Sequence, residues 1–185
     1  YPDGFSIEAY ASPDEPNYLQ SDTTSSTAAS FFGVEVSNTI FVIDTSGSMR
    51  THGRLNQVKA EMTNLLQNYP SNGKFAIVEF YNYAVTRVAW TEATPSAVSN
   101  AINVVNSLRP GGSTNYSAAL DRARSIAQQE GDVEQVIFLS DGQPTSGQTS
   151  HSAILSRVDN IVSEGARVDT IGFYINENGE DLLED

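Results

Sequence analysis

Three short segments of the sequence together supply acidic and hydroxyl side chains in a way that suits a divalent cation. The first is Asp44-Thr45-Ser46-Gly47-Ser48, in which a carboxylate and two hydroxyls recur at every second residue. The others are Gly111-Gly112-Ser113-Thr114 and Ser140-Asp141-Gly142. Their oxygen atoms are hard ligands, which suit Mg²⁺, Mn²⁺ or Ca²⁺ and not zinc or copper. The residue types therefore predict an oxygen-lined metal site built from three loops.

Short apolar runs precede two of these segments and are typical of buried strands. TIFVID at 39–44 leads into the first segment, and VIFL at 136–139 leads into Ser140. Apolar residues with helical spacing occupy the stretches between the strands, and Thr94-Pro95 has the pattern of a helix N-terminus. The further expected elements are a hairpin of 75–80 and 83–89, a strand at 168–173, and helices at 54–69, 95–108, 116–127 and 154–165.

This alternation of strands and helices predicts the fold class. We expect an α/β protein with a doubly wound, mainly parallel sheet, one antiparallel edge strand, and helices on both faces. Ligands of such sheets bind beyond the carboxyl ends of the strands, where the strand order reverses. The loops that follow residues 44 and 139 are therefore expected to meet there.

The charge and composition of the chain argue against several classes of binding partner. The net charge is −13, from 10 Lys and Arg against 23 Asp and Glu, which argues against nucleic acid and against an anionic membrane surface. All ten basic residues lie between Arg50 and Arg167, so both ends of the chain are acidic. No apolar stretch is long enough for membrane insertion, and the absence of Cys excludes disulfides and thiolate metal sites.

Taken together and in this order, FVIDTSGSM, GGSTN and FLSDG resemble a von Willebrand factor type A domain with a metal-ion-dependent adhesion site. The resemblance extends over residues 38–185 and implies a Rossmann-like fold without enzymatic activity. Carried over residue by residue, it implies that Ser46 and Ser48 bind the ion directly. It also implies that Asp44 and Asp141 act mainly through water and that Thr114 supplies the ligand of the third loop.

The resemblance further implies the function. A Mg²⁺, Mn²⁺ or Ca²⁺ ion with an open position would bind an Asp or Glu carboxylate of a partner protein. We therefore expect a cation-dependent adhesion module of a larger bacterial protein, at the cell surface or secreted. Arg50, His52 and Arg54 would form a positive rim that favours such a partner. The sequon at Asn115 favours a prokaryotic origin, since a glycan beside Thr114 would obstruct the site.

Two other functions stay open at this point. A metal-dependent phosphohydrolase would use the same carboxylates and cation, although the sequence offers no evident catalytic base. A cytoplasmic domain of this type could also serve as a subunit of an ATPase-driven complex. The glycine patterns of nucleotide-binding loops are absent. The order of Ser, His and Asp residues along the chain also does not match a catalytic triad.

The two ends of the chain form a separate question. Residues 1–37 are expected to be an arm or linker, and residues 38–185 the domain itself. Such domains usually continue with a sixth strand and a final helix, for which this chain has no matching segment. Either the chain is truncated, or the alternating segment FSIEAY (5–10) occupies the vacant edge of the sheet.

Overall fold

The structure is a computed structural model that describes residues 5–7, 30–31 and 33–173. The predictions for residues 8–10 and for the last twelve residues lie outside these ranges. Within them, no helix has both the length and the apolar character needed to cross a bilayer. The elements are β1 (Phe5–Ile7), β2 (Ser30–Phe31), β3 (Val34–Glu35), β4 (Thr39–Asp44), the 3₁₀ segment η1 (Gly47–Gly53), α1 (Arg54–Gln67), β5 (Lys74–Phe80), β6 (Ala84–Glu92), α2 (Pro95–Ser107), α3 (Tyr116–Glu130), β7 (Gln135–Ser140), α4 (His151–Ser163) and β8 (Arg167–Gly172).

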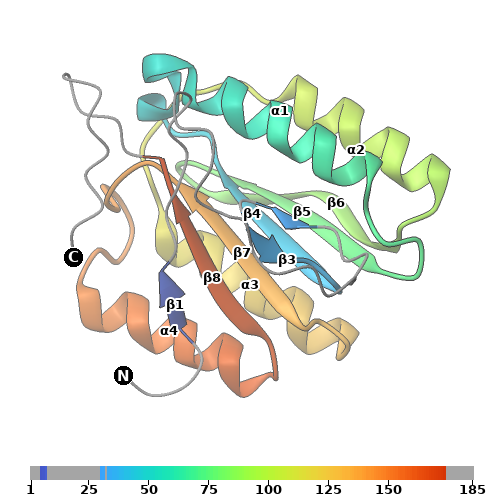
Figure 1. Ribbon diagram of the computed structural model, residues 1–185. Coiled ribbons are helices and arrows are strands. Elements are labelled where there is room, and N and C mark those ends of the chain that lie inside the picture. Colours follow the sequence, from blue (N-terminus) through green and yellow to red (C-terminus); the bar gives the residue numbers. More distant parts are fainter. Residues whose placement is uncertain (1–4, 8–29, 32, 174–185) are drawn as a thin grey trace.

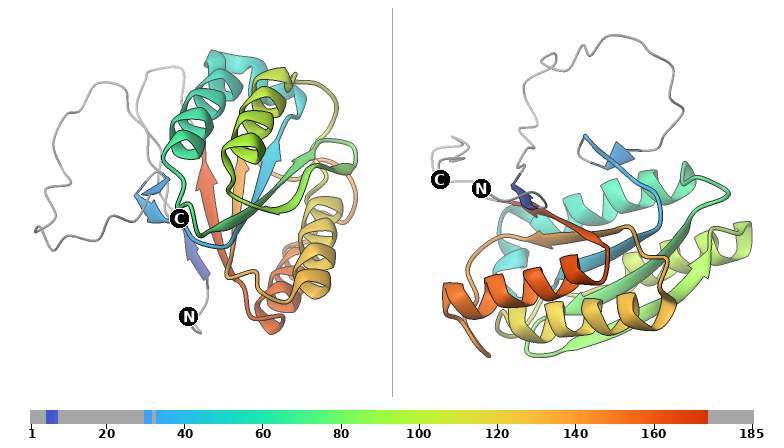
Figure 2. Two further views of the ribbon diagram at one scale, coloured as in Figure 1. Left: turned by 90° about the vertical axis from the view of Figure 1, so that its right-hand side faces the viewer. Right: turned by 90° about the horizontal axis from the view of Figure 1, so that it is seen from below.

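The described residues form a three-layer α/β fold, as the sequence predicts. The main sheet has the strand order β1-β8-β7-β4-β5-β6, and every neighbouring pair is parallel except β5 with β6. Helices α1 and α2 cover one face of the sheet, while α3 and α4 cover the other (Figure 1, Figure 2). A separate small antiparallel ribbon joins β2 to β3.

Strand β4 is the centre of the core because apolar side chains leave it on both faces. Phe41 and Ile43 pack in the layer beneath α1 and α2, and Ile40 and Val42 pack in the layer beneath α3 and α4. All four are fully buried. Each buried side chain of this size contributes roughly 1.5–3 kcal/mol, so the strand is rigidly anchored. A polar loop that follows such a strand therefore begins from a fixed point.

The strand order reverses between β4 and β7, which places two of the three predicted loops side by side. After β4 the chain moves outward to β5 and β6, and β7 returns to pair with the other edge of β4. Ile43 lies opposite Leu139, so the two strands end at the same level. This is the switch point at which doubly wound sheets bind ligands.

The outer edge of β8 is occupied by the N-terminal segment. Phe5–Ile7 pairs with β8 in parallel, with Phe5 opposite Val168. This is the edge at which the sequence analysis placed FSIEAY as one of two alternatives. The division of the chain into an arm of residues 1–37 and a domain of residues 38–185 stays a prediction.

Helix α2 begins at the predicted N-cap, and this gives a first testable expectation. The Thr94 hydroxyl accepts a hydrogen bond from the Ala97 amide at 3.2 Å, and Pro95 is the first helical residue. We expect Thr94→Ala to lower the free energy of unfolding by about 1 kcal/mol, because the amide loses its partner. Urea denaturation measures this change. Thr94→Ser keeps the hydroxyl and is the matched control, so equal losses in both variants would contradict the capping role.

Candidate metal centre

The loop after β4 directs its polar groups back toward the end of the strand. Asp44 is fully buried, and its Oδ1 accepts a hydrogen bond from the Ser46 amide at 2.7 Å. Thr45 turns to the other side, where its hydroxyl donates to Glu79 at 3.0 Å. The Ser46 and Ser48 hydroxyls lie 3.1 Å apart. The spacing of two residues therefore brings the carboxylate and both hydroxyls to one point, as predicted.

The loop after β7 completes this group. The Ser140 hydroxyl donates to Asp44 Oδ2 at 2.5 Å, and the Ser48 hydroxyl donates to Asp141 Oδ1 at 2.7 Å. Tyr116, at the start of α3, donates to the Ser140 hydroxyl at 2.7 Å. Four of the five predicted ligands, Asp44, Ser46, Ser48 and Asp141, thus belong to one connected cluster of hydrogen bonds.

Thr114 lies in a neighbouring loop that is fixed against the first. The Gly111 amide donates to the Thr45 carbonyl at 2.7 Å, and the Gly47 amide donates to the Gly112 carbonyl at 3.0 Å. Gly112 has a φ of 81°, and a Cβ there would lie 2.5 Å from the Asn82 side chain. Thr114 itself is buried. Among the described residues no hydrogen bond joins its hydroxyl to the other four, so its role as a ligand stays a prediction.

Arg54 is the unexpected member of the site. Its Nη1 lies 2.6 Å from Asp141 Oδ2, and the two side chains are only 11% and 1% exposed. The hypothesis of a rim is therefore wrong for Arg54, which points inward. His52 adopts a φ of 52° and Gly53 a φ of 70°, and this break turns the chain so that α1 begins at Arg54. Arg50 and His52 are exposed, as a rim requires.

Burial controls the electrostatics of the cluster. Loss of hydration raises the pKa of Asp44 above its usual value, against the hydrogen bonds from Ser140 and Ser46, and the nearby Asp141 carboxylate raises it further. Burial likewise raises the pKa of the Tyr116 phenol, which stays a neutral donor. A buried carboxylate without a cation is costly, and a divalent ion beside Asp44 would remove that cost.

The donor set fits a hard divalent cation. It consists of oxygen atoms only, from two carboxylates and the Ser46 and Ser48 hydroxyls. In the described part of the chain, no three His, Cys, Asp or Glu side chains are arranged so that they could hold a metal ion, so a conventional His- or acid-rich centre is not formed there. Few direct anionic ligands would leave a bound ion strongly positive.

The sequence did not indicate Ser140 and Tyr116 as participants in the site, and it indicated Arg54 only as part of a rim. Ser140 belongs to the predicted segment Ser140-Asp141-Gly142, and its position at the end of β7 could have indicated that its hydroxyl takes part in the site. Tyr116 follows Thr114 closely, but nothing in its sequence context indicates that it reaches across to Ser140. The ion pair of Arg54 depends on the backbone break at His52, which no local pattern predicts.

The sequence of this chain matches a known protein family. A sequence model of the von Willebrand factor type A domain matches residues 39–143, which is more than half of the chain. The chain belongs to this family. The mouse inter-alpha-trypsin inhibitor heavy chain H2 is 28% identical over 144 residues, which is 73% of this chain but 15% of that protein. The chain thus spans a small part of its curated relatives.

Solved structures show the same fold. A von Willebrand factor type A protein from Catenulispora acidiphila has a TM-score of 0.67 at 20% identity, over 78% of this chain and 34% of that one. The manganese-loaded TRAP protein of Plasmodium vivax has a TM-score of 0.60 at 19% identity, over 74% and 57%. The mussel byssus protein PTMP1, whose adhesion-site motif is occupied by zinc, has a TM-score of 0.61 at 21% identity, over 74% and 36%.

Proposed function

We propose that this von Willebrand factor type A domain binds a protein partner through a divalent cation held at a metal-ion-dependent adhesion site. The observation that carries the proposal is the cluster of Asp44, Ser46, Ser48 and Asp141 at the point where the strand order reverses. Ser46 and Ser48 would bind the ion through their hydroxyls, and Asp44 and Asp141 would hold its water molecules. Thr114 would supply the ligand of the third loop.

The charges of this cluster favour an anionic ligand once an ion is bound. Asp44 and Asp141 are negative, and Arg54 neutralises Asp141 through a contact of 2.6 Å. A divalent ion would therefore leave the site with a net charge of about +1, in a partly buried setting where charges are weakly screened. The bound cation would supply an electrophilic coordination position. An Asp or Glu carboxylate of a partner is the side chain whose charge and oxygen donors match it.

The choice of metal is part of the same proposal. The donor oxygens favour Mg²⁺, with Mn²⁺ and Ca²⁺ as the alternatives. Two structural neighbours are a manganese-loaded and a zinc-occupied protein, which supports a divalent cation without selecting one. Zinc is therefore a further candidate, although hydroxyl and carboxylate oxygens favour harder ions.

A titration of a carboxylate probe tests the proposed function. The probe is N-acetylglutamate N-methylamide, and the matched control is the glutamine analogue, which has the same shape without the charge. We expect the NMR amide signals of the loops at 44–48 and 140–142 to shift with the glutamate probe in Mg²⁺ but not in EDTA. Equal shifts with and without Mg²⁺, or equal shifts with both probes, would contradict the proposal.

A metal-dependent phosphohydrolase would use the same residues but would require one more group. It needs a catalytic base, and both His side chains, His52 and His151, are exposed and outside the hydrogen-bonded cluster. Turnover of p-nitrophenyl phosphate that requires Mg²⁺ and is lost in Asp44→Ala would favour that alternative. We propose that the domain is not an enzyme, so no such turnover is expected.

We also propose a setting for the domain. The chain is similar in sequence to an inter-alpha-trypsin inhibitor heavy chain and similar in fold to a type V pilus tip protein of Porphyromonas gingivalis. These support a module of a bacterial cell-surface or secreted protein. The alternative is a cytoplasmic subunit of an ATPase-driven complex. Affinity capture from a surface extract and from a cytoplasmic extract, each with Mg²⁺ and with EDTA, separates the two, because only the correct extract yields a partner that EDTA releases.

A further inference from the structure

Uncompensated positive charge gathers beside the candidate metal centre, although the chain as a whole is acidic. Six of the ten basic side chains form ion pairs within the described residues: Arg54, Lys74, Arg87, Arg124, Arg157 and Arg167. Three of the other four, Arg50, Lys59 and Arg109, surround the C-terminal end of α2. We refer to these three as the α2 basic edge.

The side chains of the α2 basic edge are held by neutral groups, so their charge is retained. Lys59 Nζ donates to the Leu108 carbonyl at 2.7 Å, and Arg109 Nη1 donates to the same carbonyl at 2.8 Å. Arg50 Nη2 donates to the Pro110 carbonyl at 3.1 Å. Both cations share the Leu108 carbonyl and therefore lie close together. Burial lowers the pKa of Lys59, and the nearby Arg109 charge lowers it further. Carbonyls at a helix C-terminus orient such cations without neutralising them.

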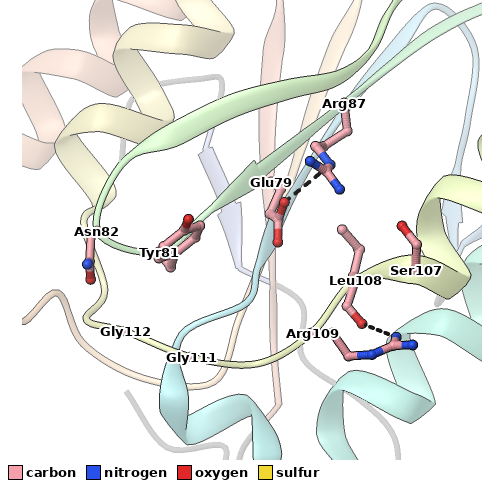
Figure 3. Close-up of a pocket in the computed structure, with 9 residues that line it drawn as sticks. All are labelled: Glu79, Tyr81, Asn82, Arg87, Ser107, Leu108, Arg109, Gly111 and Gly112. Carbon is pink, nitrogen blue, oxygen red and sulfur yellow. Dashed lines mark hydrogen bonds and ion pairs between the residues drawn. The ribbon is translucent and has the colours of Figure 1, made fainter.

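A pocket of about 480 Å³ opens next to this edge. Figure 3 shows Arg87 and Glu79 on one side of it and Arg109 on the other, with Gly111 and Gly112 on the segment at the lower left. Glu79 lies 3.3 Å from Arg87, so this pair is neutral and Arg109 leaves the pocket positive. Tyr81, Asn82, Ser107 and Leu108 complete the lining. The pocket thus combines two guanidinium groups with polar and aromatic surface.

The pocket and the candidate metal centre share a structural element. The segment Gly111–Gly112, which lines the pocket, is the one whose backbone bonds to Thr45 and Gly47 of the metal loop. Thr114, the predicted third ligand, follows two residues later. A short extended chain that reached the metal centre would therefore lie within a few residues of the pocket.

We propose that this pocket binds a second carboxylate of the same partner segment, next to the carboxylate that the metal binds. The inference rests on the proposed function and assigns a partner with two acidic residues close together in sequence. Arg109 and Arg87 are the recognition residues, because a guanidinium group binds a carboxylate through two parallel hydrogen bonds. The α2 basic edge adds long-range attraction for an acidic segment, which raises the rate of association.

A peptide titration followed by NMR tests the pocket separately from the metal. The probe is acetyl-Glu-Gly-Glu-Gly-Glu-amide, and its glutamine counterpart is the neutral control. In EDTA we expect the probe to shift the amide signals of Arg87, Arg109, Gly111 and Gly112. In Mg²⁺ the affinity should rise at least roughly tenfold, because the second contact becomes intramolecular.

Substitutions of Arg87 and Arg109 test whether their guanidinium groups bind the acidic peptide. Arg109→Gln should weaken binding in EDTA by roughly two- to fivefold, and the double variant Arg87→Gln/Arg109→Gln should weaken it more. Arg122→Gln is the matched control, since Arg122 is exposed on α3 and has no ion pair within the described residues. Arg109→Gln leaves the pair of Arg87 and Glu79 intact but removes the hydrogen bond to the Leu108 carbonyl, so its urea unfolding midpoint is compared with that of the wild type to show that the weaker binding does not come from a change in folding.

The possible outcomes separate the two proposals. Equal binding by wild type and the double variant in EDTA, or signal shifts away from the pocket, would overturn the pocket assignment. Tighter binding of inorganic phosphate than of the glutamate peptide would overturn the choice of a carboxylate. Binding at the pocket in EDTA that Mg²⁺ does not strengthen would support the pocket as a carboxylate site and contradict the proposed metal function.

Discussion

Asp44→Ala is expected to lower the affinity for Mg²⁺ by about 100-fold or more. The Asp44 carboxylate is fully buried at the end of the central strand, and it accepts hydrogen bonds from the Ser46 amide and the Ser140 hydroxyl. Removal of the carboxylate takes away one of two negative charges and releases both of these donors. Loss of residues that orient metal ligands typically reduces metal affinity 10- to 100-fold, and loss of a charge at the site adds to this. Calorimetric titration with Mg²⁺ measures the change.

The stability of the metal-free variant provides an independent check on this result. Because burial raises the pKa of Asp44, its ionised form is unfavourable without a cation. We therefore expect Asp44→Asn, which keeps the volume without the charge, to unfold at a denaturant concentration no lower than that of the metal-free wild type. Asp159→Asn is the control for loss of a carboxylate, since Asp159 is exposed on α4. Unchanged Mg²⁺ affinity in Asp44→Ala would contradict the metal assignment.

Arg54→Met is expected to destabilise the metal-free protein by about 3–5 kcal/mol. Arg54 and Asp141 form an ion pair at 2.6 Å with both side chains largely buried, so removal of the cation leaves a buried carboxylate unpaired. Mg²⁺ should restore much of the loss, because the ion takes over the neutralisation of Asp141. Urea denaturation with Mg²⁺ and with EDTA measures both effects.

Two further variants separate the charge of Arg54 from its packing. Arg54→Lys keeps a cation and should lose less stability than Arg54→Met in EDTA, although it lacks the planar fork of the guanidinium. Arg122→Met removes an exposed Arg and should change stability by no more than about 0.5 kcal/mol. Identical stabilisation by Mg²⁺ in wild type and Arg54→Met would show that Arg54 and the metal do not act on the same carboxylate.

The sequence predicted the fold and the core of the site because both depend on local patterns. Apolar runs marked β4 and β7, and the alternation of strands with helices implied a parallel sheet whose strand ends meet. The spacing of Asp44, Ser46 and Ser48 then brought their side chains together at the end of a rigid strand. Patterns of this kind are readable from one sequence because each acts over a few residues.

Features that depend on contacts between distant parts of the chain could not be predicted from the sequence. Arg54 follows two residues with positive φ angles, His52 and Gly53, and the partner of its side chain, Asp141, lies 87 residues away in the sequence. The reach of Tyr116 to Ser140 similarly requires the packing of α3 against the sheet. The pocket beside the site is formed by β5, β6 and the end of α2. The sequence predicts the hairpin of β5 and β6, but nothing in it predicts that the end of α2 lies beside that hairpin.

The position of a bound ion tests the central claim most directly. Crystals grown with Mn²⁺ would give an anomalous signal from the metal itself. We expect a single strong peak within bonding distance of the Ser46 and Ser48 hydroxyl oxygens, close to Asp44 and Asp141. A peak at any other place, or none at a Mn²⁺ concentration that saturates the protein in solution, would contradict it.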